Sequence, residues 1–90
     1  MFQMTPDAAM LVRDLTDRAQ SSAGAGLRIV VDPLHDSLSM HIATSPAADD
    51  VVVTRDGANV FLSPSAAHRL HRRTLRADLS PARSSFFLDS

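Results

Sequence analysis

The 90-residue sequence contains no cysteine. A chain without cysteine forms no disulfide, has no thiolate nucleophile and offers no thiolate to a metal ion. Tryptophan, tyrosine, lysine and glutamate are also absent, so all nine basic side chains are arginine and all ten acidic side chains are aspartate. These absences exclude thiolate chemistry before any motif is considered.

Long apolar runs and excess charge are missing too. No run approaches the roughly 18 apolar residues that a membrane-spanning helix requires, and the opening "MFQMTPDAAM" has no basic region followed by an apolar stretch. The net charge of −1 provides no field that would attract nucleic acid or acidic lipid. We therefore expect a cytoplasmic protein with neither a membrane nor nucleic acid as its partner.

The apolar content and the length together predict one domain over residues 1–90. Apolar side chains make up 44% of the sequence, which is enough for a single core. Helical periodicity of apolar residues predicts a first helix over residues 5–22, with Thr5 as its N-cap and Pro6 at its first position. The "SSAGAG" stretch then ends the helix because Gly24 and Gly26 disfavour its continuation.

The remaining segments predict six strands and a second, short helix. Alternating or β-branched apolar residues mark the strands, Asp56-Gly57 marks a hairpin turn, and "SPSAAHRLH" marks the helix. The expected strands span residues 27–31, 37–42, 51–54, 59–62, 74–79 and 84–88. The order α-β-β-β-β-α-β-β predicts an α+β domain with a mostly antiparallel sheet and the N-terminal helix packed on that sheet.

Alternation within two strands predicts which side chains face the core. In the strand over residues 37–42, we expect Leu38, Met40 and Ile42 to point inward. Phe86 and Phe87 are adjacent in the last strand, so their side chains face opposite sides of the sheet. One of the two phenylalanines is then exposed unless a neighbouring subunit covers it, which motivates the expectation of a homodimer.

Three segments of the sequence resemble the HesB-like family, the A-type iron–sulfur cluster carriers. "MTPDAA" resembles the family's opening "lTdaA", "GLRIVVD" resembles its "GLRvgV" strand, and "DDVVVTRDGANVFLSPSAAHRL" resembles its "gDvvvesdGvkvvvDp…yL" stretch. The resemblance covers nearly the whole chain. It implies the HesB-like α+β fold, oligomer formation and a connection with iron–sulfur cluster assembly.

The family's cluster-binding motifs have no counterpart here. The family carries a "GGCSGF.Y" loop after the first strand and a "CGCG" tail, whose thiolates hold iron or the cluster. The loop aligns with "PLHDSLSM", which places His35 at the cysteine position, and the chain ends at "SFFLDS". We therefore expect no iron–sulfur cluster, and an accessory or protein-binding module in place of a carrier.

The turn "DPLHDS" holds the residues with the best chemistry for a metal. His35 and Asp36, with Asp32 nearby, are of the types that bind zinc or iron. His41 lies six residues further on, but strand alternation points it outward and nothing places it beside His35. Iron or zinc binding by His35 and Asp36 is therefore the alternative to a plain structural turn or a contact with a partner protein.

A basic segment follows the expected second helix. His68, Arg69, Arg72, Arg73 and Arg76 form a candidate surface for an acidic protein partner. Stacking aromatic residues are absent nearby, which disfavours nucleic acid, and the plain alternative is a solvated helix end. The sequence has no G-x-S-x-G elbow and no glycine-rich phosphate loop, so we do not expect an enzyme.

Overall fold

A computed structural model describes residues 1–19 and 23–89 of the chain. The two helices and seven strands are, in order, β1 (Gln3–Met4), α1 (Pro6–Arg18), β2 (Gly26–Asp32), β3 (Ser37–Ala43), β4 (Val51–Arg55), β5 (Ala58–Leu62), α2 (Pro64–Arg69), β6 (Thr74–Leu79) and β7 (Ser84–Asp89). No helix in the described part of the chain is long and apolar enough to cross a membrane.

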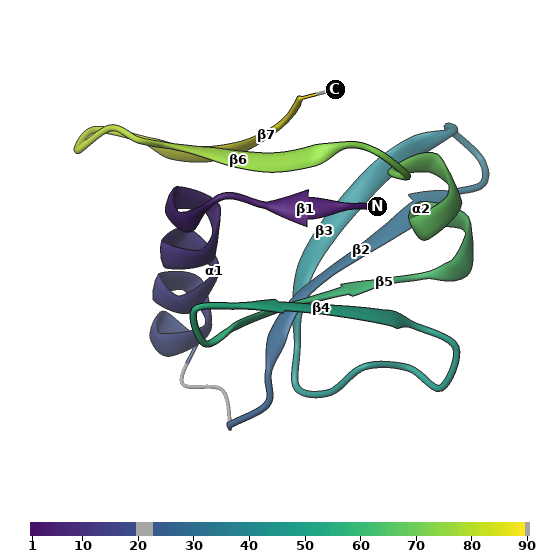
Figure 1. The fold of residues 1–90 in the computed structure, drawn as a ribbon, viewed down its shortest axis with the longest axis horizontal. Helices are drawn as coiled ribbons and strands as arrows, with labels where there is room; N and C mark the ends of the chain where they lie inside the picture. The colour runs from purple at the N-terminus through teal and green to yellow at the C-terminus, as the bar shows by residue number, and fades with distance from the viewer. Residues whose placement is uncertain (20–22, 90) are drawn as a thin grey trace.

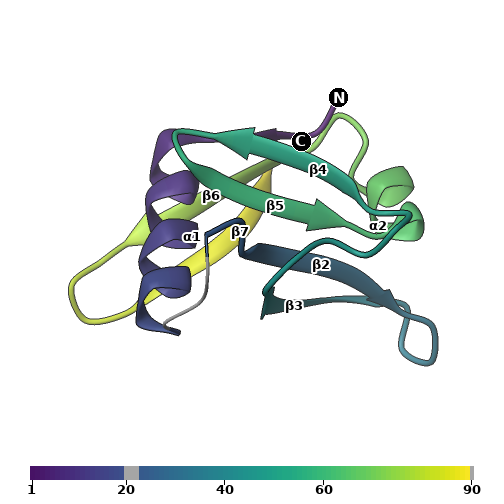
Figure 2. The same cartoon turned by 90° about the horizontal axis from the view of Figure 1, so that it is seen from below.

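The strands form two sheets, with the helices at opposite ends of the molecule (Figures 1 and 2). The larger sheet has the order β3-β2-β5-β4, and the smaller has the order β1-β6-β7. The pairs β2–β3, β4–β5 and β6–β7 are antiparallel, whereas β1–β6 and β2–β5 are parallel. The predicted α+β class is confirmed, but two sheets replace the expected single one.

The N-terminal helix is shorter than predicted at its C-terminal end. Thr5 is the N-cap: its hydroxyl accepts a hydrogen bond from the backbone N–H of Ala8 at 3.1 Å, and Pro6 follows at the first helical position. The helix ends at Arg18 with Ala19 as its C-cap. The predicted continuation through residues 20–22 lies outside the described residues.

The hairpin predicted at Asp56-Gly57 is present and is closed by Arg55 opposite Ala58. Asp56 and Gly57 both have positive φ, 51° and 80°, as a two-residue turn between twisted antiparallel strands requires. The sequence did not predict β1, because a strand of two residues is too short to show periodicity. It pairs in parallel with β6, where Thr5 N donates to Leu75 O at 3.0 Å.

The core lies between the two sheets and against the inner sides of both helices. The larger sheet contributes Leu27, Ile29, Val60 and Leu62, and both helices contribute small or apolar side chains to the same cluster. Phe86 packs against this core while Phe87 is 48% exposed, which confirms that their side chains face opposite sides.

The inward alternation predicted for β3 is correct at two positions and wrong at the third. Leu38 and Ile42 pack against the core, whereas Met40 is exposed at 36%. The strand lies at the edge of the larger sheet, so it has a neighbour on one side only and the sheet does not enclose its central side chain.

Candidate functional site

The turn between β2 and β3, residues 33–36, is organised by the aspartate that precedes it. Asp32 Oδ1 accepts a hydrogen bond from Leu34 N at 2.9 Å, and Asp32 Oδ2 lies 2.8 Å from His35 Nδ1. Asp36 then has a positive φ of 51°, a conformation that aspartate adopts more readily than most residues. The local hydrogen bonds of Asp32 therefore fix the shape of the turn.

These hydrogen bonds also set the charge of the turn. The hydrogen bond with His35, followed by the one from the backbone N–H of Leu34, lowers the pKa of Asp32 below its ordinary value. Asp32 thus stays ionised, and its carboxylate holds Nδ1 of the imidazole. The side chain of His35 is 74% exposed, so its Nε2 is presented to solvent.

The structure joins the turn to the second helix through Arg69. This arginine donates one hydrogen bond to the backbone oxygen of Asp36 at 2.8 Å and a second to the Asp36 carboxylate. The two residues are 33 positions apart in sequence, so no local pattern reveals the pairing. The sequence analysis proposed two separate candidate sites, the turn with His35 and Asp36 and the basic segment. In the structure these two sites are joined by one ion pair.

A groove of about 590 Å³ lies beside this ion pair. It is lined by Val31, Pro64, Ser65, His68 and Arg69. Leu34, in the neighbouring turn, is 87% exposed. The combination of an apolar side chain, an apolar groove wall and one arginine of the helix, Arg69, suits a protein segment better than a small polar molecule.

The other residues of the basic segment do not gather at the groove. Arg76 lies on β6 and pairs with Asp89 of β7 at 3.1 Å. Arg73 is half-buried, and its Nε has no hydrogen-bond partner among the described residues. Arg72 is exposed in the turn after α2, where it has a positive φ of 66°. The structure therefore leaves His68, Arg69 and Arg72 as the members of the segment on or next to α2.

The donor groups of the turn offer little to a metal ion by themselves. The Asp36 carboxylate is engaged by Arg69, and Asp32 engages one ring nitrogen of His35. Within residues 1–19 and 23–89, no three histidine or aspartate side chains gather as potential ligands. A thiolate-held cluster does not fit this chain at all, because its sequence has no cysteine.

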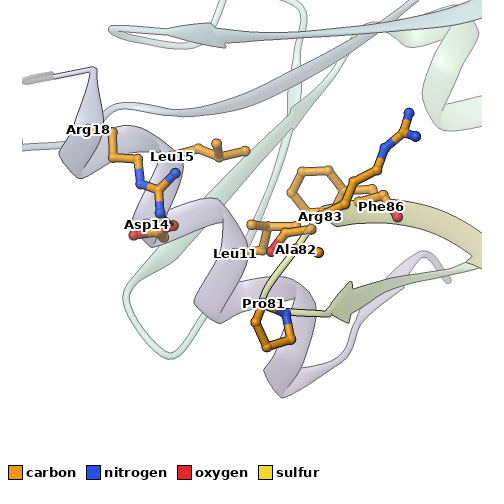
Figure 3. A pocket seen from close by; sticks show the side chains of 10 residues that line it. Leu11, Asp14, Leu15, Arg18, Pro81, Ala82, Arg83 and Phe86 are labelled. Carbon is orange, nitrogen blue, oxygen red and sulfur yellow. Dashed lines mark ion pairs between the residues drawn. The ribbon is translucent and has the colours of Figure 1, made fainter.

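A second cavity of about 280 Å³ lies between α1 and the turn that joins β6 to β7 (Figure 3). Leu11, Leu15 and Phe86 give it an apolar wall, and Arg83 lies on its rim. Arg18 also lines it, but its guanidinium pairs with Asp14 at 3.1 Å. None of the candidate metal or partner-binding residues named from the sequence lines this cavity.

Comparison with known proteins gives matches in structure only. No family model matches the chain, and no curated protein matches it in sequence. Among solved structures, Escherichia coli SufA, involved in the biosynthesis of iron–sulfur clusters, superposes with a TM-score of 0.81 at 21% identity, over 99% of this chain and 84% of SufA.

Two further solved structures give the same result. IscA, solved with a 2Fe-2S cluster, has a TM-score of 0.75 at 20% identity, over 100% of this chain and 85% of IscA. A protein from Aquifex aeolicus has a TM-score of 0.76 at 18% identity, over 99% and 90% of the two chains. The expected HesB-like fold is confirmed: this cysteine-free chain has the fold of SufA and IscA.

Proposed function

We propose that this chain is a non-enzymatic, cytoplasmic protein-binding module that is accessory to iron–sulfur cluster assembly and carries no cluster. The observation that carries the proposal is the bond between Arg69 and Asp36. It ties the turn at which the resemblance places the cluster loop to α2, through the Asp36 backbone oxygen at 2.8 Å and its carboxylate. A turn held in this way is suited to present a fixed surface.

The surface consists of the groove beside α2 together with Leu34, His68 and Arg72. Leu34, in the turn next to the groove, is 87% exposed and offers an apolar contact beside it. His68 lines the groove, and Arg72 is exposed in the turn that follows α2. The complementary partner is an acidic protein segment that includes an apolar side chain.

The binding proposal is tested by titrating the protein with a synthetic peptide of about 12 residues rich in aspartate, glutamate and leucine. We expect amide NMR shifts centred on Val31, Leu34, His68, Arg69 and Arg72, and weaker binding as salt is raised. A matched peptide with lysine in place of the acidic residues is the control. Equal binding of both peptides, or shifts centred elsewhere, contradicts the proposal.

The absence of a cluster is tested by anaerobic reconstitution with iron and sulfide, using a cysteine-containing carrier such as SufA as the positive control. We expect no visible absorbance of a cluster and no retained sulfide, because cluster irons are held by thiolates and this chain has none. A stable, stoichiometric cluster on the chain contradicts the proposal.

A second candidate function is metal binding by His35, with Asp36 as the neighbouring acid. The observation that favours it is the 2.8 Å contact between Asp32 Oδ2 and His35 Nδ1, because a carboxylate on the other ring nitrogen is the usual support of a metal-binding histidine. Since the described residues offer no group of three ligands, further ligands must come from a second molecule.

Titration calorimetry with zinc and with ferrous iron tests this alternative. We expect a stoichiometry below one metal per chain for a site shared between molecules, and loss of the binding heat in His35→Ala. The control is His71→Ala, since His71 lies outside the turn. A binding heat that persists unchanged in His35→Ala contradicts a site at this histidine.

A further inference from the structure

The cavity between α1 and the β6–β7 turn has an apolar inner part (Figure 3). Leu11 and Leu15 are four positions apart on α1, so their side chains share one face of the helix and line the cavity together. Phe86 of β7 lies across from them. Leu11 is buried, and Leu15 and Phe86 are half-buried, so a molecule that enters the cavity meets apolar side chains on two sides.

The helix end of the cavity carries a neutralised pair of charges. Arg18 follows Leu15 on the same face of α1 and also lines the cavity. Its guanidinium is paired with the Asp14 carboxylate at 3.1 Å, and the two groups lie side by side on the helix in Figure 3. Because each charge of this pair is compensated by the other, this end of the cavity selects neither an anion nor a cation.

The opposite rim is formed by the β6–β7 turn, whose shape is fixed by local hydrogen bonds. Arg83 N donates to Ser80 O at 3.1 Å across a four-residue turn that has Pro81 at its second position, where proline is favoured. Asp78 Oδ1 accepts a hydrogen bond from Ser80 N at 3.1 Å. The turn therefore holds the backbone of Arg83 at a defined place on the rim of the cavity.

Arg83 gives this rim an uncompensated positive charge. Its side chain is exposed and forms no ion pair with another described residue. The nearby Asp78 does not line the cavity, and its carboxylate is used by the turn backbone. Ser84 and Ser85 add hydroxyl donors to the same rim. A guanidinium accompanied by hydroxyl groups is complementary to a carboxylate.

The volume of the cavity limits its ligand to a small molecule. About 280 Å³ is the space of roughly nine water molecules at about 30 Å³ each, so a ligand of about ten non-hydrogen atoms fills it. Small-molecule sites combine a mostly apolar lining with a few polar groups that fix the orientation of the ligand. The leucines and the phenylalanine supply the first of these features here, and Arg83 with its neighbouring serines supplies the second.

Other classes of small ligand match less of the cavity. A cation meets Arg83 at the rim, and the Asp14 carboxylate that could attract it is already paired with Arg18. Inorganic phosphate suits the charge of Arg83 but leaves the apolar inner part in contact with water. A molecule with one anionic group and one apolar body matches both parts of the cavity.

We propose that this cavity binds a small monocarboxylic acid of about six to nine carbon atoms. The apolar body of the acid lies against Leu11, Leu15 and Phe86, and its carboxylate lies at the rim, where Arg83 donates to it. The ligand thus bridges α1 and the β6–β7 turn. This inference goes beyond the proposed function and does not depend on it, because the cavity shares no residue with the groove beside α2.

Amide NMR titration of the full chain with hydrocinnamate, a phenyl-substituted propionate, tests the site. We expect saturable shifts centred on Leu15, Arg83, Ser84 and Phe86, with a Kd of about 0.1–1 mM. Hydrocinnamyl alcohol, which keeps the apolar body but has no charge, is expected to bind about five- to tenfold more weakly. Hydrocinnamylamine, with the opposite charge, and acetate, without the apolar body, are each expected to bind at least about tenfold more weakly than the acid.

Two substitutions separate the charge of the site from its apolar wall. Arg83→Gln is expected to weaken binding of the acid at least about fivefold and to leave binding of the alcohol unchanged. Leu15→Ala removes part of the apolar wall and is expected to weaken both ligands about threefold or more. Arg13→Gln is the matched control, because Arg13 is an exposed arginine of α1 that does not line the cavity. It is expected to bind both ligands as the unaltered chain does.

Circular dichroism verifies that each variant is folded. Arg83→Gln keeps the backbone bond to Ser80, and it alone decides the outcome if Leu15→Ala does not fold. The proposal is overturned by an absence of saturable shifts up to about 10 mM hydrocinnamate, by shifts centred elsewhere, or by equal binding of the acid and the amine. Unweakened binding of the acid in a folded Arg83→Gln or Leu15→Ala variant, or equal weakening in Arg13→Gln, also overturns it.

Discussion

Arg28 and Asp50 form an ion pair with two hydrogen bonds across the outer face of the larger sheet. Nε donates to Oδ2 at 2.8 Å and Nη2 donates to Oδ1 at 3.1 Å, and the side chain of Asp50 is fully buried. Asp50 Oδ2 also accepts from Ala47 N at 2.9 Å. One carboxylate thus fastens the loop before β4 to the middle of β2.

Replacement of Asp50 by asparagine is expected to lower the free energy of unfolding by about 1–2 kcal/mol, because it removes the charge from two charge-assisted hydrogen bonds at a buried position. Urea denaturation of the two proteins measures the difference. The control is Asp49→Asn, since Asp49 is exposed and should change stability by less than about 0.5 kcal/mol. Equal losses of unfolding free energy in both variants would show that the bonds to Arg28 do not stabilise the fold more than an exposed aspartate does.

Acid is expected to remove the contribution that the Asp50 carboxylate makes to the stability of the fold. The hydrogen bond from Arg28 lowers the pKa of Asp50, and the one from His35 lowers the pKa of Asp32. A carboxyl group whose pKa is lower in the folded than in the unfolded state stabilises the fold above its unfolded pKa, and this stabilisation is lost as the pH falls through the folded pKa.

The stability of the unaltered chain should therefore fall below about pH 4, where the unfolded carboxyl groups take up protons. Denaturation curves measured from neutral pH down to about pH 2.5 test this expectation. The difference in stability between the unaltered chain and Asp50→Asn should narrow over the same interval. A difference that stays constant to the lowest pH would contradict the assigned pKa direction.

Close packing of two backbone segments explains why residue 26 is glycine. A Cβ built at Gly26 would lie 2.4 Å from the backbone oxygen of Asn59, a contact that requires backbone movement. Gly26→Ala is expected to cost about 2–3 kcal/mol, which corresponds to a melting temperature about 10–20 °C lower for a domain of this size.

Thermal unfolding followed by circular dichroism measures this effect, and Gly24→Ala provides the comparison. Gly24 has a positive φ of 90° but nothing within 4 Å of a built Cβ, so its substitution carries conformational strain without a clash. We expect a smaller loss, about 1–2 kcal/mol. If Gly24→Ala proved the more harmful of the two, the close approach at Asn59 would not be the controlling factor.

Local sequence patterns predicted the elements of this fold well and their mutual arrangement less well. Helix capping at Thr5, the Asp56-Gly57 turn and the alternation at Phe86 and Phe87 all depend on neighbours within a few residues, and each was predicted correctly. The partition into two sheets depends on parallel pairings between distant strands, such as Leu27 with Val60. No periodicity within a strand encodes such a pairing.

The candidate site shows the same division. The sequence identified His35, Asp36 and Arg69 by residue type, but it did not connect them, because the ion pair spans 33 positions. Arg28 carried a usable signal, since a charged side chain within an apolar strand implies a partner. Its partner Asp50 is 22 positions away, and several other aspartates were equally eligible.

Loss of the Arg69 side chain is expected to loosen the turn at residues 33–36 without unfolding the domain. The Asp36 side chain is 83% exposed, so solvent screens the ion pair and Arg69→Gln should change the free energy of unfolding by less than about 1 kcal/mol. Locally, the hydrogen bond to the Asp36 backbone oxygen is weakened, and amide exchange in the turn should accelerate several-fold.

Hydrogen exchange measured by NMR at Leu34, His35 and Asp36 resolves this local effect from global opening. Arg72→Gln is the matched control. This substitution also removes a positive charge from the region, but Arg72 makes no bond to the turn among the described residues. Exchange that accelerates equally in both variants would indicate a general effect of charge. Acceleration in Arg69→Gln alone would establish that α2 holds the turn in place, which is the premise on which the proposed binding surface depends.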